Sequence, residues 1–173
     1  EVNASQNDKD FVAAINWKKA EEYLAAGKAH DMPANYAHNV YDESTQMATS
    51  TMKNSVKVLI PSECPDMVYF LPTPKSPHGV DVDPTGEYIV GAGKLSANLT
   101  VHSFTKMLAA IENQSFEKEI EDIPVLKFDE VVAGVVKDAG LGPLHTEFDG
   151  KGNAYTSFFI SSEVVNGMWV HGK

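Results

Sequence analysis

Two stretches of the chain repeat one pattern: a histidine, a strand-like run, a turn and a tyrosine. The first stretch is residues 78–88 (HGVDVDPTGEY) and the second is residues 145–155 (HTEFDGKGNAY). In both, the tyrosine follows the histidine by ten residues, and a proline lies shortly before the histidine. Val80 and Val82 alternate with acidic residues ahead of a Pro-Thr-Gly turn, which is the pattern of a β-hairpin. The repeat therefore predicts two equivalent hairpins.

The repeat favours a mainly β fold, part of a β-propeller with helical insertions. In a propeller the first strand of each blade lines the central axis, so equivalent positions in successive blades converge at one end of the channel. The two histidines are 67 residues apart, whereas a blade usually takes about 40–45 residues. Two explanations stay open: the intervening segment is an insertion, or it holds a further group of strands.

The rest of the chain is predicted from local patterns. One helix begins near Trp17, and a second is capped by Ser103 and carries apolar residues at helical spacing. The segment 129–138 is ambiguous, because its valines favour a strand while its flanking residues mark the ends of a helix. Residues 30–53 are polar and aperiodic, which predicts a long loop. The other predicted strands are residues 11–15, 56–60, 67–71 and 99–101.

Charge and cysteine content exclude several classes of protein. With 14 basic and 24 acidic residues, the chain has a formal net charge of -10. It therefore lacks the basic surface that nucleic-acid binding requires. No apolar run reaches the length of a membrane span. The single cysteine, Cys64, cannot form an internal disulfide, which leaves the cellular compartment open.

His78 and His145 are the candidate metal ligands, because a propeller would bring their equivalent positions to one place. The alternative is a non-catalytic propeller-type binding module in which both histidines are structural, and a pair of histidines does not decide between the two. Ligands of one metal cluster should have nitrogens within roughly 8 Å of one another, whereas structural histidines should lie at separate blade edges. Cys64 is expected to be a buried or incidental thiol rather than a nucleophile. Four other histidines are expected at the surface: His30, His38, His102 and His171.

Several longer runs resemble one enzyme family, the nitrous oxide reductases. Residues 75–79 (KSPHG), continuing through residues 83–96, are similar to one blade of that family. The run at residues 141–156 (LGPLHTEFDGKGNAYT) is the longest and most specific, and residues 7–11 (NDKDF) are a weaker match in register. The resemblance covers most of residues 7–165. The spacing of the histidines is typical of the more divergent branch of the family.

The resemblance implies a copper enzyme that reduces N₂O to N₂ and water. Its members have a seven-bladed propeller whose hub holds a four-copper sulfide cluster bound by seven histidines. A following cupredoxin domain holds a dicopper centre. His78 and His145 match two of the cluster ligands and would be the catalytic and cofactor-binding residues. The family also implies a periplasmic homodimer that receives electrons from a c-type cytochrome or a cupredoxin.

The same resemblance places Asp10 at the position of a carboxylate ligand to a structural calcium. Ser76 stands where the family often has an asparagine, which puts that site in doubt. The other five cluster histidines and the cysteine-rich dicopper motif are absent from this sequence, and the residues from Asn166 onward depart from the family pattern. We therefore expect residues 1–173 to be an incomplete propeller domain, an internal fragment without the cupredoxin domain, and inactive alone.

Overall fold

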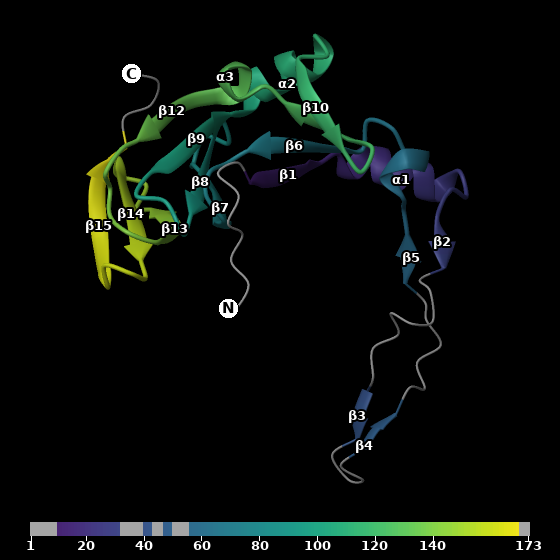
Figure 1. Ribbon diagram of the computed structural model, residues 1–173, viewed down its shortest axis with the longest axis horizontal. Helices are drawn as coiled ribbons and strands as arrows, with labels where there is room; N and C mark the ends of the chain where they lie inside the picture. Colours follow the sequence, from purple (N-terminus) through teal and green to yellow (C-terminus); the bar gives the residue numbers. More distant parts are fainter. Residues whose placement is uncertain (1–9, 32–39, 43–46, 50–55, 170–173) are drawn as a thin grey trace. The chain divides into compact units, whose positions relative to one another are not determined.

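The computed structural model describes residues 10–31, 40–42, 47–49 and 56–169. The chain is mainly β, with several small sheets and few helices (Figure 1). It divides into two compact units, one formed by residues 1–14 with 69–173 and the other by residues 15–68. The predicted mainly β class is confirmed. No helix in the described ranges is long and apolar enough to cross a bilayer.

The first repeat forms half of a four-stranded antiparallel sheet, here called sheet I, with strand order β12-β9-β8-β7. The predicted hairpin is present, and its turn is organised by Asp83. The Asp83 carboxylate accepts hydrogen bonds from the Tyr88 backbone N–H at 3.0 Å and from the Thr85 hydroxyl at 2.7 Å. Gly86 supplies the positive φ of 77° that closes the turn. The strands are β7 (Pro77–Val82), β8 (Tyr88–Gly93), β9 (Leu99–Ser103) and β12 (Val132–Val136).

The second repeat forms sheet II, a three-stranded antiparallel sheet of order β13-β14-β15. Its hairpin is also as predicted. Asp149 organises the turn by accepting hydrogen bonds from the backbone N–H groups of Lys151 at 2.7 Å and Asn153 at 3.1 Å. The strands are β13 (Pro143–Phe148), β14 (Asn153–Phe158) and β15 (Glu163–Met168).

The segment between β9 and β12 is an insertion that also contains strands, so both explanations of the long repeat interval hold in part. The helix α2 (Phe104–Glu112) begins where the sequence predicts, with the Ser103 hydroxyl accepting from the Lys106 N–H at 3.1 Å. Strands β10 (Phe116–Ile120) and β11 (Ile123–Leu126) follow. They join sheet III, whose order is β1-β6-β11-β10, with β1 (Phe11–Ile15) and β6 (Val68–Pro72).

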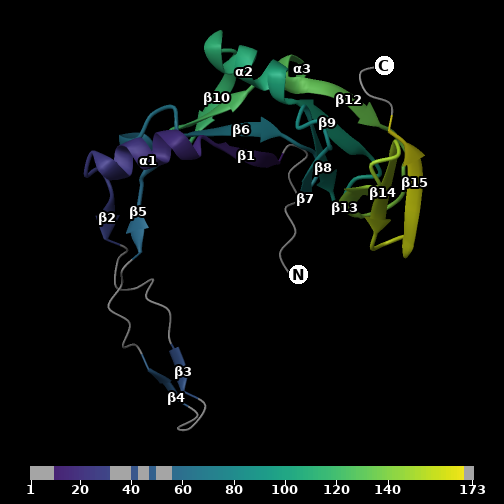
Figure 2. The same ribbon diagram turned by 180° about the vertical axis from the view of Figure 1, so that it is seen from behind.

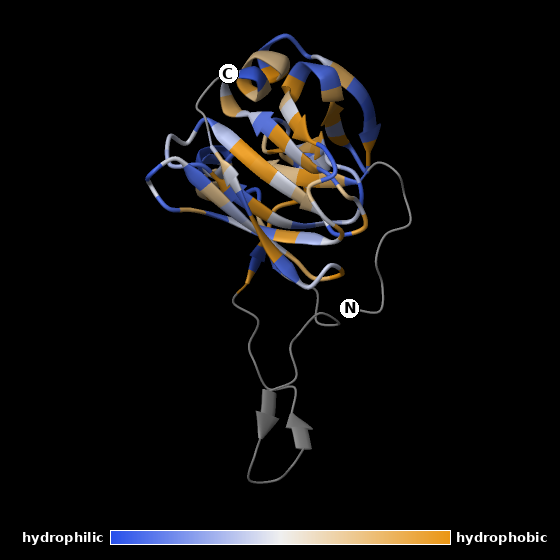
Figure 3. Cartoon of the chain, turned by 90° about the vertical axis from the view of Figure 1, so that its left-hand side faces the viewer, coloured by the Kyte–Doolittle hydropathy of each residue, from blue (hydrophilic) through white to orange (hydrophobic). Residues whose placement is uncertain are grey.

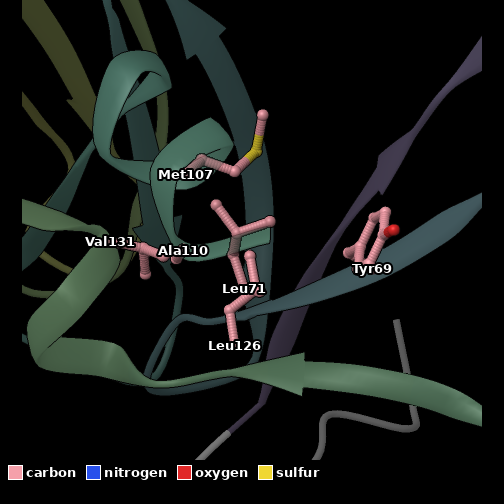
Figure 4. Close-up of a cluster of buried hydrophobic side chains, with 6 residues drawn as sticks. All are labelled: Tyr69, Leu71, Met107, Ala110, Leu126 and Val131. Carbon is pink, nitrogen blue, oxygen red and sulfur yellow. The ribbon is translucent and has the colours of Figure 1, made fainter. Parts of the chain in front are cut away.

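Sheet III and α2 share one hydrophobic cluster. Met107 and Ala110 on α2 pack against Leu71 of β6 and Leu126 of β11 (Figure 4). The segment 129–138, whose sequence favours both helix and strand, contributes Val131 to this cluster. It begins as the short helix α3 (Phe128–Val131) and continues as β12, so both patterns in its sequence are expressed in turn.

A second cluster lies on sheet I. Val90, Leu99 and Val101 are buried there, and Phe148 of sheet II packs against them. Hydrophobic and hydrophilic residues alternate along the strands, as expected when one face of a sheet is covered (Figure 3). Sheets I and II are therefore joined by a common core.

The unit formed by residues 15–68 contains the helix α1 (Trp17–Ala25), capped by Asn16, whose side chain accepts from the Lys19 N–H at 3.1 Å. Cys64 is buried, as expected. The loop prediction for residues 30–53 is wrong in part, because three short strands lie in the described part of that range: β2 (His30–Asp31), β3 (Val40–Asp42) and β4 (Met47–Thr49). Strand β3 pairs with β4, and β2 pairs with β5 (Lys57–Val58), which follows the predicted loop. The 3₁₀ turn η2 (Pro61–Glu63) comes after β5.

Candidate metal centre

Each candidate histidine lies in the edge strand of its sheet, at an irregularity in the pairing. In sheet I, Pro77 pairs with Gly93 and Gly79 with Ala92, so His78 is the extra residue on β7. In sheet II a similar shift falls between Pro143 and Thr146, the stretch that contains His145. A β-bulge turns a side chain away from the direction that the regular pleat would give it. The repeat therefore carries its histidines at equivalent irregular positions.

The two edge strands lie side by side (Figures 1 and 2). Gly79 allows the close approach, because a Cβ at this position would lie 2.9 Å from His145 Nδ1 and would overlap the carbonyl oxygen of Leu144. The ring centroids of His78 and His145 are 5.2 Å apart, with an interplanar angle of 81°. At that separation the ring nitrogens fall within the roughly 8 Å expected for ligands of one metal cluster.

Asp81 bridges the two strands from β7 to β13. Its Oδ2 accepts a hydrogen bond from the Thr146 backbone N–H at 2.7 Å, and its Oδ1 lies 3.2 Å from His145 Nδ1. The Asp81 side chain is 18% exposed, whereas that of His145 is 54% exposed. A largely covered carboxylate thus holds an imidazole that is open to solvent.

The donor set suits a soft or borderline metal but is incomplete. Neutral imidazole is a good copper ligand, and both histidine side chains are accessible. Across residues 10–31, 40–42, 47–49 and 56–169, however, no three His, Cys, Asp or Glu side chains are grouped so that they could hold a metal ion. The pair therefore fits as two members of a larger ligand set.

Asp10 lies near the start of β7, where the sequence resemblance suggests calcium. Its Oδ2 accepts from the backbone N–H of Ser76 at 2.7 Å. Ser76 is 5% exposed and has a φ of 51°. The two residues named for the calcium site are therefore brought together, two positions before His78.

One surface assignment is wrong: His102 is fully buried on β9. Its Nε2 lies 3.0 Å from the Thr73 hydroxyl, and its Nδ1 has no hydrogen-bond partner in the part of the chain that the structure describes. Burial lowers the pKa of His102 to about 4. The signal in the sequence is its place inside an apolar strand. His30 is exposed and pairs with Glu63 at 2.7 Å. His38 and His171 lie outside the described residues.

Two further residues escaped sequence reasoning. In the sequence Asp81 is one of the acidic residues that alternate with Val80 and Val82, and nothing nearby marks a special role, because its partner His145 is 64 residues away. Trp169 follows β15 in the segment that departs from the family pattern. Its Nε1–H donates to Asp83 at 3.2 Å, and its ring meets Phe148 edge-on with the centroids 5.0 Å apart. Trp169 therefore links the turns of the two hairpins.

The chain is similar in sequence to known enzymes. No family model matches the chain. It is 38% identical over 96 residues to the nitrous-oxide reductase of Ralstonia nicotianae, which is 56% of this chain and 13% of that protein. It is 29% identical over 160 residues to the enzyme of Pseudomonas fluorescens, which is 92% of this chain and 21% of the relative. The chain thus spans between about an eighth and a fifth of the relatives it matches.

Among solved structures, the chain is similar to the hydrazine synthase of Kuenenia stuttgartiensis. The TM-score is 0.45 at 16% identity, over 94% of this chain and 46% of that one. The sequence comparisons bear out the resemblance that the histidine-containing runs predicted. Over part of its relatives' length, the chain is a homologue of the nitrous-oxide reductases.

Proposed function

We propose that the chain is part of a copper enzyme that reduces nitrous oxide to dinitrogen and water. In this proposal His78 and His145 are ligands of its four-copper sulfide cluster. The observation that carries the proposal is the ring pair: two imidazoles from corresponding repeats lie with centroids 5.2 Å apart. The homology to nitrous-oxide reductases supports the identity of the metal and of the substrate.

The proposal extends to the fold. Sheets I and II would be adjacent blades of a seven-bladed propeller, with β7 and β13 as their innermost strands. Each sheet is an antiparallel meander, and the edge strands that carry the histidines lie against one another. The segment from α2 to α3 would be an insertion between the third and fourth strands of the first blade. Residues 1–173 would then form an incomplete propeller domain.

The chain's own residues would hold the metal rather than carry out the proton chemistry. His78 and His145 would each offer a neutral nitrogen, and Gly79 and Asp81 would set the distance and orientation of the rings. When bound, the copper cluster would bind nitrous oxide and supply electrons to it. No side chain of this chain is proposed as a proton donor.

Further features are proposed from the family alone. They are a periplasmic location, a homodimer, a dicopper centre in a cupredoxin domain and electron delivery by a c-type cytochrome or a cupredoxin. Calcium at Asp10 belongs with them, and its support here is the contact between Asp10 and the Ser76 backbone.

The alternative is a non-catalytic propeller module with structural histidines. The contact between His145 and Asp81 is compatible with it, because structural histidines and metal-bound histidines both make such a bond. The position of His78 argues against the alternative, since the rings of His78 and His145 lie together rather than at separate blade edges. A shared metal accounts for both observations.

The test is the copper content of the complete protein. We expect His78→Ala and His145→Ala to lower bound copper and to abolish consumption of nitrous oxide. His30→Ala is the control, because His30 is an exposed histidine paired with Glu63. Full copper loading and activity in both ligand variants would remove the proposal.

A further inference from the structure

We propose that Asp81 is a positioning residue that fixes the tautomer of His145, so that Nε2 is the nitrogen offered to the metal. The role of His145 toward a metal rests on the proposed function, whereas its tautomer does not. Asp81 is three residues after His78 on β7, yet it acts on the ring of the other strand. It would therefore couple the two ligand strands.

The first step is that the carboxylate of Asp81 is fixed independently of the imidazole. Its Oδ2 accepts from the Thr146 backbone N–H at 2.7 Å, and a backbone N–H can only donate. Thr146 adjoins His145 and is itself buried, so this bond anchors the carboxylate beside the histidine. The position of Oδ1 is then set by covalent geometry.

The second step concerns which ring nitrogen carries the proton. Oδ1 of Asp81 lies 3.2 Å from His145 Nδ1, and an ionised carboxylate only accepts. In a neutral ring Nδ1 must then be the donor, which leaves the lone pair on Nε2. Metal-bound histidines commonly donate their other ring N–H to a carboxylate in this way.

The third step is that the ring has little freedom to exchange its nitrogens. A Cβ at Gly79 would lie 2.9 Å from Nδ1, so the backbone of β7 closely flanks that side of the imidazole. Within the described part of the chain, the His145 ring makes one hydrogen bond, the contact of its Nδ1 with Asp81. The repeat offers no equivalent carboxylate on β13, because the third residue after His145 is Phe148.

The variant Asp81→Asn separates this role from a merely structural one. An amide has only one oxygen. That oxygen should stay at the Thr146 N–H, because this hydrogen bond is the shorter of the two that Asp81 makes. The amide NH₂ would then face Nδ1 and donate to it, which forces the proton onto Nε2. The volume hardly changes, but the tautomer should reverse. Glu147→Gln, at an exposed position on β13 two residues after His145, is the control for loss of charge.

The measurement is ¹⁵N NMR of the imidazole nitrogens in the ¹⁵N-labelled full chain, with His145 assigned through His145→Gln. We expect Nδ1–H in the unmodified chain and in Glu147→Gln, and Nε2–H in Asp81→Asn. An Nε2–H tautomer in the unmodified chain overturns the inference, and so does an Nδ1–H tautomer that persists in Asp81→Asn. The first of these results does not depend on whether Asp81→Asn folds.

A second arm separates failure of this inference from failure of the proposed function. In the complete protein loaded with copper alone, Asp81→Asn should lose about 10-fold to 100-fold in copper affinity, and Glu147→Gln should lose none. Unchanged affinity in Asp81→Asn contradicts the positioning role. If the tautomer is as expected but the unmodified protein takes up no copper, the proposed function fails while the Asp81–His145 geometry stands.

Discussion

The backbone of Gly79 lies against the carbonyl group of Leu144 with no room for a side chain between them. A Cβ at Gly79 would lie 2.9 Å from the Leu144 carbonyl carbon and closer still to its oxygen. Backbone atoms cannot rotate away as a flexible side chain would. The distance between the strands of His78 and His145 therefore depends on this glycine.

The variant Gly79→Ala should push β7 and β13 apart. We expect it to lower the free energy of unfolding by about 1–3 kcal/mol, the usual cost of overpacking, and to lower copper retention as well. Gly134→Ala and Gly167→Ala are matched controls, because a Cβ at either position meets nothing within 4 Å. Urea unfolding curves measure the effect. A stability for Gly79→Ala equal to that of the controls would contradict the close packing.

His102 should make the protein less stable in mild acid. Burial lowers its pKa from 6.5 to about 4. The unfolded chain therefore binds a proton more readily than the folded one, and stability is lost as the pH falls from 6.5 towards 4. At roughly 1.4 kcal/mol per pH unit, the loss between pH 7.5 and pH 5 should be about 2 kcal/mol. Chemical denaturation at the two pH values measures it.

The control for that loss is His102→Leu, which removes the titrating ring and should flatten the pH dependence above pH 5. Carboxylates contribute at lower pH: hydrogen bonds from Ser103 and Asn153 lower the pKa of Glu87 and Asp149 below their ordinary values of 4.5 and 3.8. An equal loss of stability in His102→Leu would show that another group is responsible.

Trp169→Ala tests whether the residue that follows β15 belongs to the native core. The substitution removes the contacts with Tyr88 and Phe148 and the bond to Asp83. We expect a loss of about 2–3 kcal/mol in the free energy of unfolding. Trp17→Ala is the matched control, because Trp17 is 60% exposed on α1. Equal effects of the two variants would indicate that Trp169 contributes no packing.

Asp10→Asn tests the proposed calcium. If Asp10 is a ligand, removing calcium with a chelator should lower the melting temperature of the unmodified protein and leave that of Asp10→Asn unchanged. The amide can still accept from the Ser76 N–H, so the backbone contact survives. The melting temperature measured with and without chelator decides the matter. A chelator effect of equal size in both proteins would remove Asp10 from the site.

The sequence predicts the features that depend on neighbouring residues. The two hairpins, the Ser103 cap and the strand of residues 11–15 each follow from a few adjacent positions, and the structure has them at those positions. The ambiguous segment 129–138 shows the limit of this reasoning. Its two competing patterns are both used, one after the other.

The contacts that sequence reasoning missed join residues far apart in the chain. His102 is buried because β9 is an inner strand of sheet I, where the segment containing Thr73 covers it. Asp81 reaches His145 only because Gly79 lets two edge strands approach. No local pattern carries that information, whereas the repeat and the family resemblance predict His78 and His145 as ligands without it.

The most direct test of the central claim is a crystal structure of the complete, copper-loaded protein, with anomalous data collected at the copper edge. The account predicts copper peaks at about 2 Å from one ring nitrogen of His78 and from Nε2 of His145. A copper-containing structure in which either imidazole is uncoordinated, or a protein that holds no copper, would contradict it.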